Sequence, residues 1–276
     1  MEIEISGKFR TPPSEFKQGD RMITCGIDVG SITTKAALAK DGEVIADKVV
    51  FTGYNARLAG ENVFDEILRQ SGLTRPSIDK IISTGYGRNS LDFADKAITE
   101  ITCHAAGSHY LDPEVRSVID IGGQDSKAIA VNASGSPLNF VMNDKCAAGT
   151  GRFLEVMARA LEVDLDNFGE FALKAQHPSS ISSLCTVFAE SEVISLIAKG
   201  EQRENIIAGI HDAIAARVVT MANRVGFNPK VMMTGGVAKN SGVVRALEHK
   251  IGHKIEVSAK SQVTGAIGAA ILAQRA

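Results

Sequence analysis

The chain has no block of lysine and arginine and no apolar run long enough to cross a membrane. Its 30 basic residues are matched by 32 acidic ones, which gives a formal net charge of −2. A nucleic-acid-binding protein usually carries a basic patch or stripe. Neither nucleic acid nor a membrane is therefore expected as a partner.

The first 21 residues lack the apolar core of a signal peptide and mix charges with Pro12 and Pro13. We predict a short extension over residues 1–21 before the fold begins. With no export signal we expect a cytoplasmic protein, in which structural disulfides are disfavoured. The four cysteines, Cys25, Cys103, Cys146 and Cys185, would then be thiols, and thiolate–metal chemistry is open to them.

An internal repeat organises the 276 residues, of which 44% are hydrophobic and could form the cores of two modest domains. The segment IDVGSITTK (27–35) aligns without gaps to IDIGGQDSK (119–127). A weaker pair, KIISTGYGRNS (80–90) and KVMMTGGVAKNS (230–241), shares an apolar run that ends in Thr-Gly. The chain therefore contains two related halves.

Each half opens with a predicted three-stranded meander, with hairpin turns at Asp41-Gly42 and Ser134-Gly135. Apolar periodicity predicts helices over residues 61–70, 151–162, 188–199 and 203–225. The fold class is α/β, with two domains flanking a cleft. We predict a first domain over 22–117, a second over 118–264 and a C-terminal connecting helix over 265–276.

The two Asp-x-Gly turns offer what a triphosphate needs, namely close backbone N–H groups, hydroxyls and positive charge. In the first turn these come from Gly30, Ser31, Thr33 and Lys35, and in the second from Gly122 and Gly123. Gln124, a neutral amide beside the second turn, is predicted to orient the attacking water.

Asp28 and Asp120 end apolar strands, so both carboxylates are expected in the cleft, where Mg²⁺ and its water shell would offset their repulsion. The segment MMTGGVAKN (232–240) ends a strand with two glycines, and we expect adenine near Gly235 and Gly236. Further nucleotide contacts are predicted at Lys239, Asn240, Thr150, Gly151 and Arg152.

One Asp-x-Gly turn alone is usually an ordinary hairpin. Two copies in register with a downstream Thr-Gly-Gly resemble the phosphate-1, phosphate-2 and adenosine motifs of the actin, sugar kinase and Hsp70 ATPase superfamily. GAIGAA (265–270) is similar to its small-residue connecting helix. The resemblance implies an actin/Hsp70-like (ribonuclease H-like) duplicated fold around a nucleotide cleft.

Two cysteine segments, NDKCAAGTGRFLEVMA (143–158) and SSLCTVFAESEVIS (182–195), have no role in a sugar kinase or chaperone. With STGYGRNSL and IDIGGQDSK they resemble the activator ATPases of 2-hydroxyacyl-CoA dehydratases, the archerase group that includes benzoyl-CoA reductase ATPase subunits. The resemblance implies a homodimer that binds ATP or ADP, Mg²⁺ and one [4Fe-4S] cluster. A ferredoxin or flavodoxin would supply the electron, and a dehydratase, a benzoyl-CoA reductase or a double-cubane cluster protein would receive it.

Counting thiols gives a parallel interpretation. A cubane cluster takes four thiolates, and one chain offers only Cys146 and Cys185 in suitable loops, so a two-fold dimer completes the set. The competing interpretation is two buried thiols. Cys25, in the first strand, and Cys103, in a helix, are interpreted as structural. Since Thr150, Gly151 and Arg152 follow Cys146, we expect nucleotide and cluster to be coupled through this segment.

Two other classes of protein remain open. A small-molecule kinase on the same fold would need a carboxylate base, for which Asp125 is the candidate. A nucleotide-gated binding module would have structural cysteines only. Isolated histidines at helical positions are usually surface or packing residues, so His104 and His211 are left unassigned. Colour separates the three classes, because only the iron–sulfur protein would be brown.

Overall fold

The computed structural model describes residues 22–182 and 185–276. The predicted extension over 1–21 and two residues of the second cysteine segment lie outside this range. Two five-stranded sheets dominate the structure. The first has the order β3-β2-β1-β4-β5, with β1 Ile23–Val29, β2 Thr33–Lys40, β3 Glu43–Phe51, β4 Lys80–Thr84 and β5 Lys96–Ala97. The second has the order β10-β9-β6-β7-β8, with β6 Ser117–Ile121, β7 Ser126–Val131, β8 Pro137–Asn143, β9 Val231–Thr234 and β10 Ile255–Val257.

The two sheets have the same topology. In each, the first three strands form an antiparallel meander, and the first strand also pairs in parallel with the fourth, β1 with β4 and β6 with β9. Asp41 and Gly42 both have positive φ, which suits the tight turn predicted between β2 and β3. The duplication predicted from the repeat is confirmed, and so is the α/β class.

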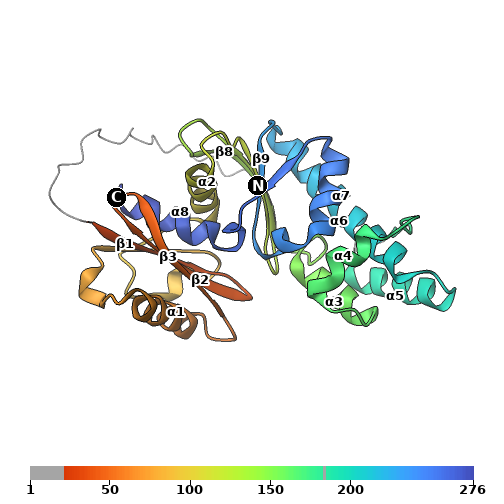
Figure 1. Ribbon diagram of the computed structural model, residues 1–276, viewed down its shortest axis with the longest axis horizontal. Helices are drawn as coiled ribbons and strands as arrows, with labels where there is room; N and C mark the ends of the chain where they lie inside the picture. Colours follow the sequence, from red (N-terminus) through yellow and green to blue (C-terminus); the bar gives the residue numbers. More distant parts are fainter. Residues whose placement is uncertain (1–21, 183–184) are drawn as a thin grey trace.

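Eight α-helices cover the sheets within the described residues. They are α1 Ala56–Ser71, α2 Glu100–Leu111, α3 Gly151–Ala160, α4 Phe168–Leu173, α5 Thr186–Ala198, α6 Arg203–Val225, α7 Ser241–Ile251 and α8 Thr264–Ala273. Figure 1 shows α2 and α8 between the two sheets, and α3, α4 and α5 at the end of the second half away from the first sheet. No described helix is long and apolar enough to span a membrane.

Side-chain alternation along the central strands decides which residues face the space between the halves. In β1, Cys25, Ile27 and Val29 pack with α1, while Gly26 and Thr24 face α8. Asp28 belongs to the second set by its even spacing. In β6 the same alternation sends Ile119 and Ile121 into the large core with α3, α6 and α7, and turns Asp120 towards α2.

Close packing of α8 against the first half depends on glycines. A Cβ at Gly26 of β1 would collide with the backbone of Ala266 and Ala270, and one at Gly268 would collide with the carbonyl of Cys103. Helices α2 and α8 therefore lie close together on the face of the sheet that carries Asp28. The predicted connecting helix packs on the first sheet, where it supports one wall of the cleft.

Candidate active site between the two sheets

Each half contributes an Asp-x-Gly turn of the same geometry. Asp28 lies opposite Lys35 across β1 and β2, and Asp120 lies opposite Lys127 across β6 and β7. The turns are closed by equivalent backbone hydrogen bonds, in which Gly30 N–H donates to a carbonyl at 3.1 Å and its counterpart Gly122 N–H does so at 2.9 Å. The Asp and Lys of the sequence repeat are thus cross-strand neighbours in both halves.

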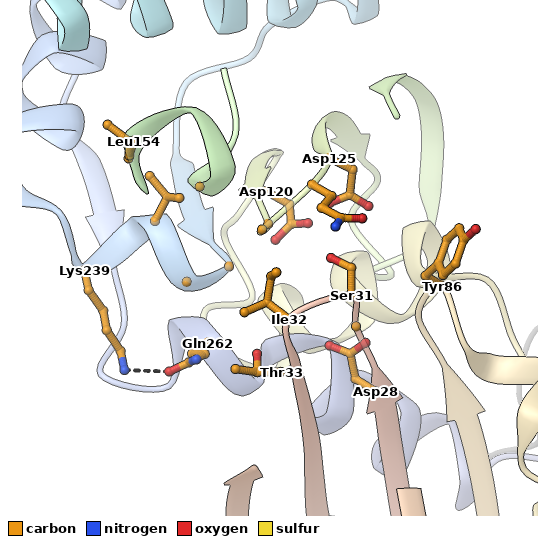
Figure 2. A pocket seen from close by; sticks show the side chains of 18 of the residues that line it. Asp28, Ser31, Ile32, Thr33, Tyr86, Asp120, Asp125, Leu154, Lys239 and Gln262 are labelled. Carbon is orange, nitrogen blue, oxygen red and sulfur yellow. Dashed lines mark hydrogen bonds between the residues drawn. The ribbon is translucent and has the colours of Figure 1, made fainter. Parts of the chain in front are cut away.

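A cavity of about 610 Å³ separates the two turns, and Figure 2 shows Asp28 and Asp120 on facing elements that line it. Most of the predicted site residues line this one cavity: Asp28, Gly30, Ser31, Thr33, Lys35, Asp120, Gly122, Gly123, Gln124, Gly151, Gly235, Gly236, Lys239 and Asn240. Residues far apart in the sequence therefore form a single site. A cavity of this volume falls in the range of small-molecule sites.

Thr150 and Arg152 are not among the residues that line the cavity. The Thr150 side chain is buried, and its hydroxyl donates to the Ala147 carbonyl at 2.6 Å. The Arg152 guanidinium pairs with Glu155 at 2.9 Å. The backbone N–H of Arg152, by contrast, donates to the carbonyl of Gly123 at 2.8 Å. Arg152 is therefore connected to the site through the backbone of the second turn.

Asp120 is buried, and its carboxylate is surrounded by a lysine and by hydrogen-bond donors. Lys127 Nζ lies 2.9 Å from Asp120 Oδ2, and the Thr234 hydroxyl donates to Oδ1 at 2.9 Å. Burial alone would raise the pKa of Asp120, but the nearby His104 and Lys127 with these hydrogen bonds hold it well below its usual value. The carboxylate is therefore ionised and available to a cation.

Lys127 is buried among three carboxylates. Besides Asp120, its Nζ lies 2.9 Å from Asp125 and 3.5 Å from Glu100. Burial lowers the pKa of Lys127, but Asp120, Glu100 and Asp125 together raise it above the ordinary value. Burial raises the pKa of Glu100, although Lys127 opposes that shift. This lysine therefore holds the carboxylates of Asp120, Asp125 and Glu100 together.

His104 has a position that the sequence reasoning missed, because it lines the cavity. Its Nδ1 lies 3.1 Å from the Thr234 hydroxyl and 3.5 Å from Asp120 Oδ1. A Cβ placed on Gly265 would be 3.0 Å from both His104 Nε2 and Asp28 Oδ2, so the ring lies between the two aspartates. Sequence reasoning left this residue unassigned. The i, i+4 spacing of Glu100 and His104 on one helix was the available signal.

His211 is a packing residue, edge-on to Phe168 at 5.5 Å.

At the end of the cavity predicted to take adenine, the backbone of Gly235 and Gly236 lies near apolar side chains. Gly235 has φ +86°, and a Cβ there would lie 2.8 Å from Asp120 Oδ1, whereas a Cβ on Gly236 would meet nothing within 4 Å. Leu154, Leu165 and Val237 also line this cavity. Lys239 Nζ donates to Gln262 Oε1 at 2.5 Å, as Figure 2 shows.

The four cysteines fall into two environments. Cys25 in β1 and Cys103 in α2 are fully buried, and burial raises the pKa of Cys103 to about 12 and that of Cys25 still higher. Their prediction as structural is confirmed. Cys146 is half-buried in the loop between β8 and α3, and Cys185 is exposed as the N-cap of α5.

The accessible cysteines fit half of a cubane ligand set. The helices that the two cysteines precede, α3 and α5, pack against each other in the second half. Within residues 22–182 and 185–276, no three His, Cys, Asp or Glu side chains converge as a metal site. Two accessible thiols per chain match a cluster that takes four thiolates from two chains.

The duplicated sheets and the cleft lined by both Asp-x-Gly turns define a protein of the actin and sugar kinase class of ATPase folds. A ROK family glucokinase from Streptomyces griseus, in complex with glucose and AMPPNP, shares this fold with a TM-score of 0.55 at 13% identity, covering 92% of this chain and 100% of that one. At this identity the likeness concerns the fold alone.

Residues 25–273 match the BadF/BadG/BcrA/BcrD ATPase family, and the chain belongs to this family. The activator of lactoyl-CoA dehydratase from Anaerotignum propionicum is 49% identical over 256 residues, which cover 92% of this chain and 98% of that protein. The activator of the 2-hydroxyisocaproyl-CoA dehydratase from Clostridium difficile, solved with bound ADPNP, has a TM-score of 0.87 at 46% identity, covering 91% of this chain and 94% of that one.

Proposed function

We propose that this chain is an ATP-dependent reductive activator. Its homodimer would hold one [4Fe-4S] cluster and couple ATP hydrolysis to low-potential transfer of a single electron onto a partner iron–sulfur enzyme. The observation that carries the proposal is the shared helix α3. Its N-terminal amides bond the second Asp-x-Gly turn at Gly122 and Gly123, and the loop that leads into it contains Cys146.

Different residues of the cavity would bind the phosphates, the adenine and the Mg²⁺ of the nucleotide. Gly30, Ser31 and Thr33 on one side and Gly122 and Gly123 on the other would bind the phosphates, and adenine would lie beside Gly235 and Gly236. Asp28 and Asp120 would hold Mg²⁺ through its water shell, a role that fits the low pKa of Asp120. Gln124 would orient the attacking water. Phosphoryl transfer of this kind depends mainly on positioning and charge.

Cys146 and Cys185 of each chain would ligate the cluster, which when bound accepts and releases one electron at low potential. Cys185 caps α5, whose N-terminal dipole favours the negative charge of a thiolate cluster. The buried Cys25 and Cys103 have raised pKa values and are unsuited to ligation. The donor set therefore supports the cluster and leaves the other half to a second chain.

Exposed apolar side chains on α5 support the homodimer. Val187, Phe188, Ile194 and Ile197 are between 42% and 67% exposed on the helix that Cys185 caps. Apolar side chains gathered on one helix mark a contact surface. A two-fold axis beside the N-terminus of α5 would bury these residues and bring four cysteines together.

The partner and the electron donor are proposed at the level of class. The family relatives named above activate lactoyl-CoA dehydratase and 2-hydroxyisocaproyl-CoA dehydratase, so the family does not specify one substrate. A 2-hydroxyacyl-CoA dehydratase is the proposed partner, with benzoyl-CoA reductase or a double-cubane cluster protein as related choices. A reduced ferredoxin or flavodoxin in the cytoplasm is the proposed electron donor.

The geometry disfavours the kinase alternative. Its candidate base, Asp125, has its carboxylate 2.9 Å from Nζ of the buried Lys127, so this side chain is already engaged in an ion pair. The nucleotide-gated binding module is disfavoured because it would give the accessible cysteines no function.

Hydrolysis of γ-labelled ATP by the anaerobic protein, with a candidate dehydratase present, tests the proposal. The label should appear in inorganic phosphate, and the electron paramagnetic resonance signal of the reduced cluster should decrease only when MgATP is added. Transfer of the label to a small molecule would establish the kinase instead.

A further inference from the structure

The loop between β8 and α3 belongs to two sites. Asp144 and Lys145 line the nucleotide cavity, and the next residue is Cys146. A flexible loop at this point would absorb any movement of the cavity wall before it reached the cysteine sulfur. The loop is instead tied at both of its ends.

At its start the loop is bound by the side chain of Asn143, the last residue of β8. The Asn143 amide donates to the carbonyl of Cys146 at 2.8 Å and to the carbonyl of Ala148 at 3.2 Å. Its Oδ1 accepts a hydrogen bond from Arg217 of α6 at 3.3 Å. One amide therefore uses both of its donor hydrogens on the carbonyls around the cysteine.

Arg217 also supports the loop through its aliphatic stem. Gly149 has φ +83°, and a Cβ there would lie 3.2 Å from Arg217 Cδ. The arginine is half-buried, and its Nε has no hydrogen-bond partner among the described residues. Helix α6 thus anchors the Asn143 amide and one side of the loop.

At its other end the loop joins the phosphate turn. The hydroxyl and the N–H of Thr150 both donate to the carbonyl of Ala147, at 2.6 and 3.0 Å. The next two amides, those of Gly151 and Arg152, donate to the carbonyls of Gly122 and Gly123 at 2.9 and 2.8 Å. Continuous hydrogen bonds therefore connect Gly122 with the Cys146 loop.

We infer that Asn143 is a positioning residue that makes the Cys146 loop rigid, so that movement of the phosphate turn with the nucleotide is passed to the cysteine. The inference rests on the proposed function, because it gives Cys146 a cluster to hold. Without the two amide donors the loop could change shape while Thr150 and α3 stayed in place. The sulfur would then no longer follow the nucleotide state.

The matched pair Asn143→Asp and Asn139→Asp tests this inference. Asn143→Asp keeps the shape and the acceptor for Arg217 but removes both donors. Asn139 is exposed on the same strand, and its Oδ1 accepts a hydrogen bond from the N–H of Phe140. Because aspartate keeps that acceptor, Asn139→Asp makes the same change of charge without losing this hydrogen bond. Arg217→Met, which keeps the stem but removes the donor to Asn143, is the second variant should Asn143→Asp fail to fold.

The measurement is the rate at which a ferrous chelator removes iron from the reduced anaerobic dimer, with ADP or with ADPNP bound. In the wild-type protein, and equally in Asn139→Asp, we expect the rate of iron loss with ADP to differ from the rate with ADPNP. In Asn143→Asp that difference should disappear, and the loss of iron with ADP should be roughly thirtyfold faster, as the loss of two hydrogen bonds of about 1 kcal/mol each would give. Arg217→Met should change in the same direction by less.

Two results would overturn the inference, and they are distinguishable. If wild-type protein and Asn143→Asp lose iron at the same rates in both nucleotides, Asn143 does not position the loop, and the proposed function stands. If the anaerobic wild-type protein contains no iron, the proposed function fails and this inference fails with it.

Discussion

His104 connects the acidic residues of the two halves. The Thr234 hydroxyl donates to Asp120, so its oxygen accepts from the Nδ1–H of His104, and the opposite edge of the ring lies near Asp28. The imidazole therefore holds Thr234, and through it Asp120, in the position where we propose that Mg²⁺ binds. This gives His104 a positioning role.

Replacing His104 by asparagine or by leucine tests that role. The amide nitrogen of the introduced asparagine takes the place of Nδ1 and keeps the hydrogen bond to Thr234, whereas leucine leaves the hydroxyl free to rotate. In ATPase assays against Mg²⁺ at saturating ATP, we expect His104→Leu to need roughly five- to tenfold more Mg²⁺ than His104→Asn, since one hydrogen bond contributes about 1 kcal/mol. Equal Mg²⁺ requirements for the two variants would contradict the role.

His211 makes the fold sensitive to acid. It is buried between α6, α4 and α7, and neither ring nitrogen has a hydrogen-bond partner in the described part of the chain. Burial lowers its pKa to about 3. The unfolded chain, with a histidine pKa of about 6.5, binds the proton first as the pH falls. The stability that depends on a neutral His211 is therefore fully present above about pH 6.5. It is lost progressively as the pH falls from there towards about 3.

Urea unfolding of the wild-type protein and His211→Phe at pH 7 and pH 5 measures this effect. Between these pH values the wild type should lose about 2 kcal/mol more than the variant, because one group protonates at about 1.36 kcal/mol per pH unit below about 6.5. Other titrating groups are common to both proteins and cancel in the comparison. The same loss in both proteins would show that His211 does not carry the acid sensitivity.

Sequence reasoning found the two aspartates but missed the histidine for a physical reason. Asp28 and Asp120 lie in gapless repeats, and strand alternation predicts the direction of their side chains. His104 is near Asp120 because α2 packs between the sheets, and its i, i+4 spacing from Glu100 does not by itself encode that tertiary contact. Thr150 was expected at the nucleotide, but its hydroxyl bonds Ala147 within its own turn.

At the scale of the elements, the close contact of β1 with α8 depends on Gly26. A methyl group there would overlap backbone atoms of Ala266 and Ala270, which a side-chain rotation cannot relieve. We expect Gly26→Ala to lower the free energy of unfolding by about 1–3 kcal/mol or more, the range found for overpacked cores.

The matched control for this prediction is Gly236→Ala, whose added Cβ meets nothing within 4 Å. Its urea unfolding midpoint should stay close to that of the wild type. A Gly26→Ala midpoint equal to that of Gly236→Ala would mean that α8 can move away from β1 without cost.

Elements with strong periodicity were predicted best. Helix α6 has the predicted bounds, residues 203–225, whereas α1 begins at Ala56 instead of residue 61, because Asn55 caps it by accepting from the N–H of Leu58. Strands β5 and β10 were not predicted. They have two and three residues, and it is pairing with β4 and β9 that makes them strands.

At the scale of the whole molecule, the proposed dimer depends on the exposed apolar side chains of α5. We expect Phe188→Asp to convert the dimer to a monomer in light scattering and to abolish iron retention, because a buried carboxylate would be desolvated at the interface. Phe51→Asp is the control, since Phe51 is 84% exposed on the other half. Phe51→Asp should stay dimeric, and a dimeric Phe188→Asp would place the interface elsewhere.

The central claim is that two chains share one cluster through Cys146 and Cys185. Iron and acid-labile sulfide, measured per dimer on anaerobically purified protein with its optical spectrum, test it most directly alongside Cys146→Ser and Cys185→Ser. The account predicts about four irons per wild-type dimer, a brown protein, and loss of the iron in either variant. A colourless protein that still hydrolyses ATP, or a variant that keeps its iron, would contradict it.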